Sequence, residues 1–139
     1  MAIRFTVNHK IYGAPRPRFR RYGGTYFPKW YYEVKELIAA AYLAAGGVLD
    51  ENPSQPKRVQ IECYRALPKS KQRKTRNIQE PDIYKPDVDN IEKVVFDALN
   101  GVAWIDDSQI VSNTTIKHPR AKRDDDCDVM VITIEDVGE

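Results

Sequence analysis

The chain has 139 residues, of which 42% are hydrophobic and 30% charged, a composition that suits a soluble globular fold and excludes a disordered chain. No apolar run approaches the length needed to span a bilayer, and the first residues lack the layout of a secretory signal, so we expect a cytoplasmic protein with no membrane partner. Cys63 and Cys127, the two cysteines, are expected as reduced thiols.

The charge of the chain is unevenly distributed. Residues 1–79 carry 16 Lys and Arg against 5 Asp and Glu, whereas residues 80–139 carry 6 against 15. Such asymmetry is typical of a protein that binds nucleic acid, with basic surface for phosphates. Two solvated faces that neutralise each other explain it equally well.

The first half of the chain predicts a strand, a loop and a helix. Apolar and polar residues alternate over residues 3–7, as in a strand with one buried face. Residues 13–21 are rich in Gly, Pro and Arg, and prolines at alternate positions exclude a helix there. Pro28 suits the first turn of a helix, and Gly46-Gly47 ends it. The expected buried face of this helix consists of Trp30, Val34, Leu37, Ile38, Ala41 and Ala45.

The second half predicts further strands around one more helix. Residues 58–64 alternate like a strand, and residues 68–84 show no periodicity and indicate a basic loop. A helix is expected from Asp87 to Asn100-Gly101. Its expected buried stripe consists of Val88, Ile91, Val95 and Ala98.

The C-terminal part adds two strands. Residues 110–117 predict a strand, residues 129–134 predict a central strand buried on both faces, and residues 123–126 predict a turn between them. The order is therefore strand, helix, strand, helix, strand, strand. It predicts one small α+β domain over residues 1–139, in which a mixed sheet carries two main helices.

Acidic residues at helical spacing follow Pro86. Asp87 falls at or near the N-cap of the second helix, and Asp89 lies in its first turn, where the helix dipole favours a carboxylate. Lys93 and Asp97 follow at intervals of four residues and share that face. Carboxylate oxygens suit a hard cation such as Mg²⁺ or Mn²⁺, and such a centre fits phosphodiester cleavage, with Lys93 offsetting charge in the transition state.

A third carboxylate is expected from Asp106-Asp107. Simpler interpretations stay open for each residue. Asp87 is explained equally by helix capping, and Asp106-Asp107 by a turn. Asp89 and Lys93 are also explained by an ordinary surface ion pair, which stabilises a helix by roughly 0.3–0.5 kcal/mol.

Three motifs carry a resemblance to a known family. They are Lys85-Pro86-Asp87-Val88-Asp89-Asn90-Ile91-Glu92-Lys93, Asp97-Ala98-Leu99-Asn100-Gly101 and Asp106-Asp107-Ser108-Gln109-Ile110. In this order they closely resemble the signature of the RusA family of Holliday junction resolvases. Arg16-Pro17-Arg18-Phe19 is similar to a further family feature.

The resemblance implies a RusA-like fold and a homodimeric, Mg²⁺-dependent endonuclease that cuts four-way DNA junctions symmetrically in recombination and repair. Asp87, Asp89 and Asp107 match its essential acidic residues, expected as the metal ligands, and Lys93 matches its essential lysine. Asp97 is assigned to structure. Gln109 is expected to orient Asp107, and a metal-binding role for Asp106 stays open.

Two basic segments are the candidate DNA contacts, since arginine suits phosphate and an aromatic ring can stack on an unpaired base. Their residues are Arg16, Arg18, Arg20 and Arg21 in the first segment and Lys71, Arg73 and Lys74 in the second. The alternative for both is a solvated loop.

Three other functions compete with junction resolution: a non-catalytic DNA-binding protein, a nuclease acting on other branched DNA, and a Mg²⁺-dependent phosphotransferase. A pure binder has no use for carboxylates facing phosphates, which counts against the first. A phosphotransferase would usually carry a glycine-rich phosphate loop, and the sequence has none.

Overall fold

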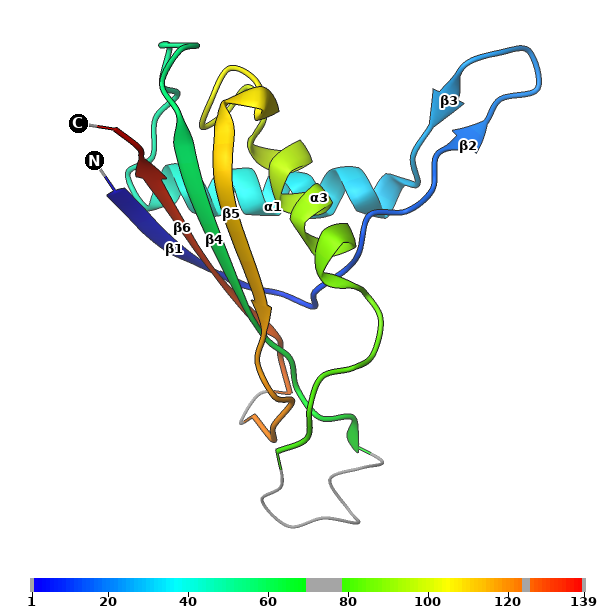
Figure 1. Cartoon of the computed structure of the whole chain (residues 1–139). Helices are drawn as coiled ribbons and strands as arrows, with labels where there is room; N and C mark the ends of the chain where they lie inside the picture. Colours follow the sequence, from blue (N-terminus) through cyan, green and yellow to red (C-terminus); the bar gives the residue numbers. More distant parts are fainter. Residues whose placement is uncertain (1, 70–78, 124–125, 139) are drawn as a thin grey trace.

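The fold is built on a four-stranded mixed sheet. A computed structural model describes residues 2–69, 79–123 and 126–138. The strands are β1 (Ala2–Asn8), β4 (Lys57–Tyr64), β5 (Ile110–Lys117) and β6 (Val129–Asp136). They lie in the order β1-β6-β4-β5, with β4 parallel to β5 and the other pairs antiparallel. Helices α1 (Lys29–Ala44) and α3 (Val88–Leu99) pack together on one face of the sheet (Figure 1). The predicted α+β class is confirmed.

Strand β6 lies between β1 and β4, which confirms its prediction as an interior strand. Met130, Ile132 and Ile134 are buried in the core, whereas the residues between them are only partly buried. The expected burial on both faces is therefore wrong, because the two helices cover a single face of the sheet.

Helix α1 buries only part of its predicted stripe, because Val34 and Ile38 are buried as expected but Ala45 is exposed. The side chains that it buries are Tyr31, Val34, Ile38 and Tyr42. Trp30 and Leu37, which were expected inside, are 37% and 40% exposed. Tyrosine rings enter the core where their hydroxyls find acceptors, and the hydroxyl of Tyr31 donates to the carboxylate of Asp97.

Helix α3 agrees with its predicted stripe except at its first residue. Ile91, Val95 and Ala98 are buried as expected, but Val88 is 41% exposed. Val88 begins the helix, and Ile91 is the first of its residues to be buried. The start of α3 therefore lies at the surface, where its polar side chains face solvent.

A short hairpin projects from the body as an arm. Strands β2 (Arg18–Phe19) and β3 (Thr25–Tyr26) pair antiparallel beyond the start of α1 (Figure 1). The loop predicted over residues 13–21 is thus partly a hairpin. Near its tip, Phe19 is 82% and Tyr22 93% exposed.

The base of this arm is fixed against the start of α3. The backbone N–H of Ala14 donates to the carbonyl of Asn90 at 3.2 Å. A Cβ on Gly13 would lie 2.7 Å from the Cβ of Pro86, so this close approach requires glycine. The arm therefore leaves the body directly beside the acidic segment.

The cysteines are free thiols, as predicted, with Cys63 buried and Cys127 partly buried. Within the described ranges, neither α1 nor α3 nor any shorter helix is long and apolar enough to cross a bilayer.

Candidate active site

The start of α3 presents two carboxylates to solvent. Asp87 occupies the N-cap position, yet its side chain makes no capping hydrogen bond. Its backbone carbonyl accepts from the N–H of Ile91 at 3.1 Å and so begins the helix. Asp89 lies in the first turn, and both residues are exposed. Helix capping therefore does not account for the carboxylate of Asp87.

Lys93 lies one turn further along α3 and is exposed. Among the residues that the structure describes, it forms no ion pair with Asp89 or Asp97. The surface pair that offered a simpler explanation of Asp89 and Lys93 is not formed. The ammonium of Lys93 is thus available to a phosphate.

Asp97, two turns after Asp89, is partly buried and accepts a hydrogen bond from the hydroxyl of Tyr31 on α1. Burial raises the pKa of Tyr31, and the hydrogen bond to Asp97 raises it further. The tyrosine therefore keeps its proton and donates it to the carboxylate. This contact links α1 to α3 and agrees with the structural role expected of Asp97.

Asp107 lies beyond the other end of α3, at the start of the short 3-10 helix η1 (Asp107–Gln109). The indole N–H of Trp104 donates to its Oδ1 at 2.7 Å, and Trp104 is fully buried, so the carboxylate has a defined orientation. Burial raises the pKa of Asp107, and the negative charges of Asp97 and Asp106 raise it further, against the lowering effect of the Trp104 bond. Asp107 is thus held where its own charge is unfavourable.

Its neighbour Asp106 has a different role. The carboxylate of Asp106 accepts from the backbone N–H of Ser108 at 3.1 Å and caps η1. This hydrogen bond lowers the pKa of Asp106. The turn that was the simpler interpretation of Asp106-Asp107 therefore accounts for Asp106, whose carboxylate stabilises the backbone that carries Asp107.

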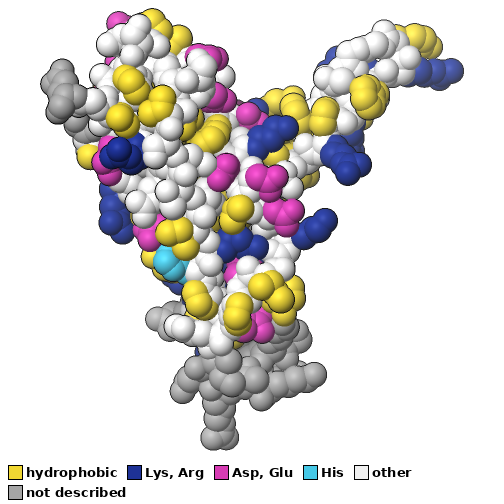
Figure 2. Space-filling model, viewed as in Figure 1, with side chains coloured by type: hydrophobic (Ala, Val, Ile, Leu, Met, Phe, Trp, Pro, Cys, Tyr) yellow, Lys and Arg dark blue, Asp and Glu magenta, His cyan; other side chains and the backbone are white. Residues whose placement is uncertain are grey.

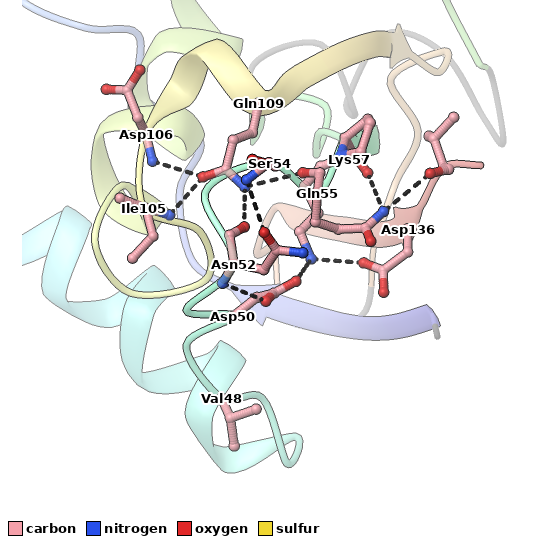
Figure 3. A network of polar contacts seen from close by, with 12 residues as sticks. Val48, Asp50, Asn52, Ser54, Gln55, Lys57, Ile105, Asp106, Gln109 and Asp136 are labelled. Atoms are coloured by element: carbon pink, nitrogen blue, oxygen red, sulfur yellow. Dashed lines mark hydrogen bonds and ion pairs between the residues drawn. The ribbon is translucent and has the colours of Figure 1, made fainter. Parts of the chain in front are cut away.

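The side chain of Gln109 also holds the backbone just before Asp107 (Figure 3). Its Oε1 accepts from the N–H groups of Ile105 and Asp106 at 2.9 and 3.0 Å. Its Nε2 donates to the carbonyls of Asn52 and Gln55 at 3.1 and 3.0 Å. Gln109 thus fixes the corner on which Asp107 sits by contacts to main-chain groups.

The predicted ligands lie in two places. Asp87 and Asp89 mark the beginning of α3, whereas Asp107 lies close to Asp97 near its end. Asp97 lies eight positions after Asp89 in the helix, which is about 12 Å along the axis. Within the part of the chain that the structure describes, no three His, Cys, Asp or Glu side chains lie together as a metal site.

The donor chemistry nevertheless fits a hard cation. All the candidate ligands are carboxylates, which suit Mg²⁺ or Mn²⁺. The pKa of Asp107 is raised mainly by burial and further by the negative charges of Asp97 and Asp106, and a bound cation would favour the charged carboxylate.

Charge on the surface is arranged around α3 and the arm. In Figure 2, acidic side chains gather over α3, and basic side chains flank them and follow the arm. The exposed arginines of the arm are Arg16, Arg18, Arg20 and Arg21. Of these, Arg20 and Arg21 lie over the rings of Tyr26 and Tyr22, each at 5.6 Å. The other predicted DNA contacts, Lys71, Arg73 and Lys74, lie outside the described residues.

Sequence reasoning missed the side chains that hold the carboxylates in place. Trp104 stands three residues before Asp107, and this spacing was the available signal. The bond from Tyr31 to Asp97 spans 66 positions, so no local pattern indicates it.

The fold and the site together define a small α+β protein whose acidic helix start lies beside a basic arm. The chain belongs to the RusA family, because the family model described as endodeoxyribonuclease RusA matches residues 9–135.

Individual relatives agree with this assignment. The chain is 31% identical over 83 residues to a crossover junction endodeoxyribonuclease from Enterobacteria phage 82, and 30% identical over 83 residues to that of Escherichia coli K12. Each match covers 59% of this chain and 57% of the relative. A relative from Shigella sonnei is 32% identical over 76 residues, which cover 54% of this chain and 51% of the relative. The chain thus spans little more than half the length of these relatives.

Proposed function

We propose that this protein is a structure-specific DNA endonuclease that cuts four-way junctions with the help of a divalent cation, Mg²⁺ or Mn²⁺. The observation that carries the proposal is the start of α3, where the exposed carboxylates of Asp87 and Asp89 neither cap the helix nor pair with Lys93. Membership of the RusA family and the names of the relatives support the choice of substrate. We take residues 1–139 as one endonuclease domain, since both helices and the four-stranded sheet share one core.

Each candidate residue has a distinct role in this proposal. Asp87, Asp89 and Asp107 would hold the cation, which when bound supplies an activated water and polarises the scissile phosphate. Lys93 places a positive charge one turn from Asp89, where it offsets the negative charge that develops on the phosphate. Trp104 keeps Asp107 in one orientation through its indole N–H.

The test is cleavage of a synthetic four-way junction, with a linear duplex of the same sequence as the control substrate. We expect paired cuts in the junction with Mg²⁺, none with EDTA, and little cutting of the duplex. Binding without cutting under every metal condition would instead identify a non-catalytic junction-binding protein. Equal cutting of forks and three-way branches would identify a nuclease of broader specificity.

We further propose that the active form is a homodimer. A four-way junction offers two symmetric scissile phosphates, and a C₂ dimer places an equivalent centre at each. The separation of Asp89 from Asp107 along α3 adds a second argument. Because an isologous interface is self-complementary, it can bring the start of α3 from one protomer beside Asp107 of the other, so that two complete sites form.

Subunit mixing tests this arrangement directly. Asp89→Asn and Asp107→Asn are expected to be inactive alone. If each site combines the two protomers, a mixed dimer has one site with both substitutions and one intact site, so nicking returns on mixing. If each site lies within one protomer, every site in the mixture is defective and no activity returns.

Light scattering of the wild type should give about twice the monomer mass of 16.0 kDa, and a strict monomer that makes paired cuts would refute the dimer.

A further inference from the structure

A buried ionic cluster lies where the chain approaches the acidic helix. Asp82 has a side chain with 0% exposure, between Arg65 at the end of β4 and Lys117 at the end of β5. Nη1 of Arg65 lies 3.0 and 3.2 Å from the two carboxylate oxygens of Asp82. Nζ of Lys117 lies 3.7 Å from Oδ1 of Asp82, and the Lys117 side chain is 11% exposed.

Lys117 makes two contacts that this ion pair does not require. Its ammonium donates to the backbone carbonyl of Tyr84 and to that of Pro86, the second at 3.0 Å. The chain before Tyr84 is held at the same edge, because Glu80 and Arg120 exchange two backbone hydrogen bonds of 3.0 and 2.8 Å. The segment from Glu80 to Pro86 therefore runs along the end of β5, and Lys117 binds the carbonyl of its last residue, Pro86.

The carbonyl of Pro86 belongs to the same peptide unit as the backbone nitrogen of Asp87. Because that unit is planar, a hydrogen bond that fixes the carbonyl also fixes the direction from which the chain enters Asp87. The side chain of Asp87 makes no capping bond that could orient the residue instead. The position of the Asp87 carboxylate thus depends on a lysine 30 places later in the chain.

We propose that Lys117 is a positioning residue for the candidate cation site. Together with Asp82 and Arg65, it anchors the Pro86–Asp87 peptide so that the Asp87 carboxylate is preorganised for a divalent cation. This inference rests on the proposed endonuclease function. Two cations and one carboxylate are costly to bury. The second cation, Lys117, is stabilised by its hydrogen bonds to the main-chain carbonyls of Tyr84 and Pro86, which lie beside the site.

Lys117→Met is the central variant. It keeps the aliphatic stem and leaves Asp82 paired with Arg65, so no uncompensated charge stays buried. We expect the Mg²⁺ concentration for half-maximal junction cleavage to rise by roughly 10- to 100-fold, the usual cost of losing an outer-shell partner, with a smaller change in kcat at saturating Mg²⁺. Lys117→Arg, which retains several donors, should recover most of the loss. Ile132→Ala in the buried centre of β6 serves as a control that lowers stability without touching the segment.

A second measurement needs no cleavage. The N–H of Ile91 donates to the carbonyl of Asp87, so its hydrogen exchange reports on the start of α3. Without metal, exchange at Ile91 should be faster in Lys117→Met than in Ile132→Ala when the two variants are compared at the same loss of Tm. If Lys117→Met fails to fold, Lys117→Gln is judged by the same two criteria. The positioning role would be overturned if Lys117→Met changed neither the Mg²⁺ concentration for half-maximal cleavage nor the amide exchange at Ile91. It would also be overturned if Lys117→Arg required as much Mg²⁺ as Lys117→Met. A wild type that does not cut junctions, or cuts them in EDTA, would refute the proposed function instead, and the exchange result would still decide whether Lys117 anchors this segment.

Discussion

Two acidic regions of the molecule differ in how their carboxylates are used. Around the ends of β4 and β6, Asp82 is enclosed by Arg65 and Lys117, and Asp128 accepts from the backbone N–H groups of Ile11 and Ala66, each at 2.9 Å. At the start of α3, Asp87 and Asp89 are exposed, and neither caps the helix.

The difference shows that partners, rather than residue type, separate structural carboxylates from candidate catalytic ones. Asp128 joins the end of β1, through Ile11, to the end of β4, through Ala66, so its charge is part of the fold. The charges of Asp87 and Asp89 contribute little to the fold beyond the helix dipole, which stabilises such a residue by about 0.3–1 kcal/mol. Side chains placed at the surface without a structural partner are those that a ligand can use.

The largest expected effect is the loss of cleavage on replacing a side chain of the second region. Asp89→Asn should reduce junction cleavage by more than about 100-fold, since even outer-shell partners of a metal are worth roughly 10- to 100-fold. Junction binding without metal should be equal or tighter, because a negative charge that faces phosphate is removed. Single-turnover cleavage and a binding titration measure both quantities. Wild-type cleavage by Asp89→Asn would show that Asp89 is not a ligand.

The arm offers the next largest effect, since the acidic helix start repels phosphate until a cation is bound. Replacing Arg16, Arg18 and Arg20 by Ala should flatten the dependence of log K on log salt by up to about three units, at roughly 0.9 per phosphate contact. The sites of cutting should not change. Arg58→Ala is a matched control, because Arg58 pairs with Glu135 at 3.5 Å, and it should leave the slope unaltered. An unaltered slope in the arm variant as well would place the arm away from DNA.

A smaller effect, on stability alone, is expected in the first region. Asp128→Ala leaves the N–H groups of Ile11 and Ala66 without their acceptor and should lower the free energy of unfolding by roughly 2–4 kcal/mol. Asp87→Ala should lower it by less than about 1 kcal/mol, because only the interaction with the helix dipole is lost. Urea denaturation of the two variants compares them. Equal losses of stability would contradict the distinction between the two regions.

Much of the fold followed from periodicity. The alternation in β4 and the spacing of Ile91, Val95 and Ala98 in α3 gave correct elements, because one-sided burial imposes those patterns. Part of the buried stripe of α1 did not follow, since Tyr31 and Tyr42 are core residues whose hydroxyls donate to Asp97 and to the carbonyl of Val48, and hydrophobic periodicity does not indicate such partners. The hairpin in the arm was missed because each of its strands has only two residues.

The site was predictable as a set of residues but not as a geometry. The motif around Asp87 and Asp89 identified the candidate ligands. It did not indicate that the length of α3 separates Asp87 and Asp89 from Asp107. The contact between Lys117 and Pro86 joins residues 31 positions apart. Such contacts depend on which strands become neighbours in the sheet, and the strand order cannot be read from a single sequence.

The smallest effect concerns two adjacent carboxylates with opposite pKa shifts. The pKa of Asp107 is raised, mainly by burial, so ionisation at neutral pH costs more in the folded state than in the unfolded state. Asp107→Asn should therefore raise Tm by a few degrees at pH 7, and this gain should shrink as the pH falls through the raised pKa and vanish below about 3.8, where both states are protonated. The pKa of Asp106 is lowered by its bond to Ser108, so its charge stabilises the fold above about 3.8 and that contribution is lost as the pH falls through the lowered value. Asp106→Asn should thus lower Tm slightly at pH 7, although asparagine also caps helices well. Addition of Mg²⁺ should raise the Tm of the wild type and of Asp106→Asn but not that of Asp107→Asn, because of these two neighbours Asp107 alone is proposed to join Asp87 and Asp89 as a ligand. A Tm that falls in Asp107→Asn at pH 7, or that rises with Mg²⁺ in this variant as in the wild type, would show that Asp107 belongs with the structural carboxylates.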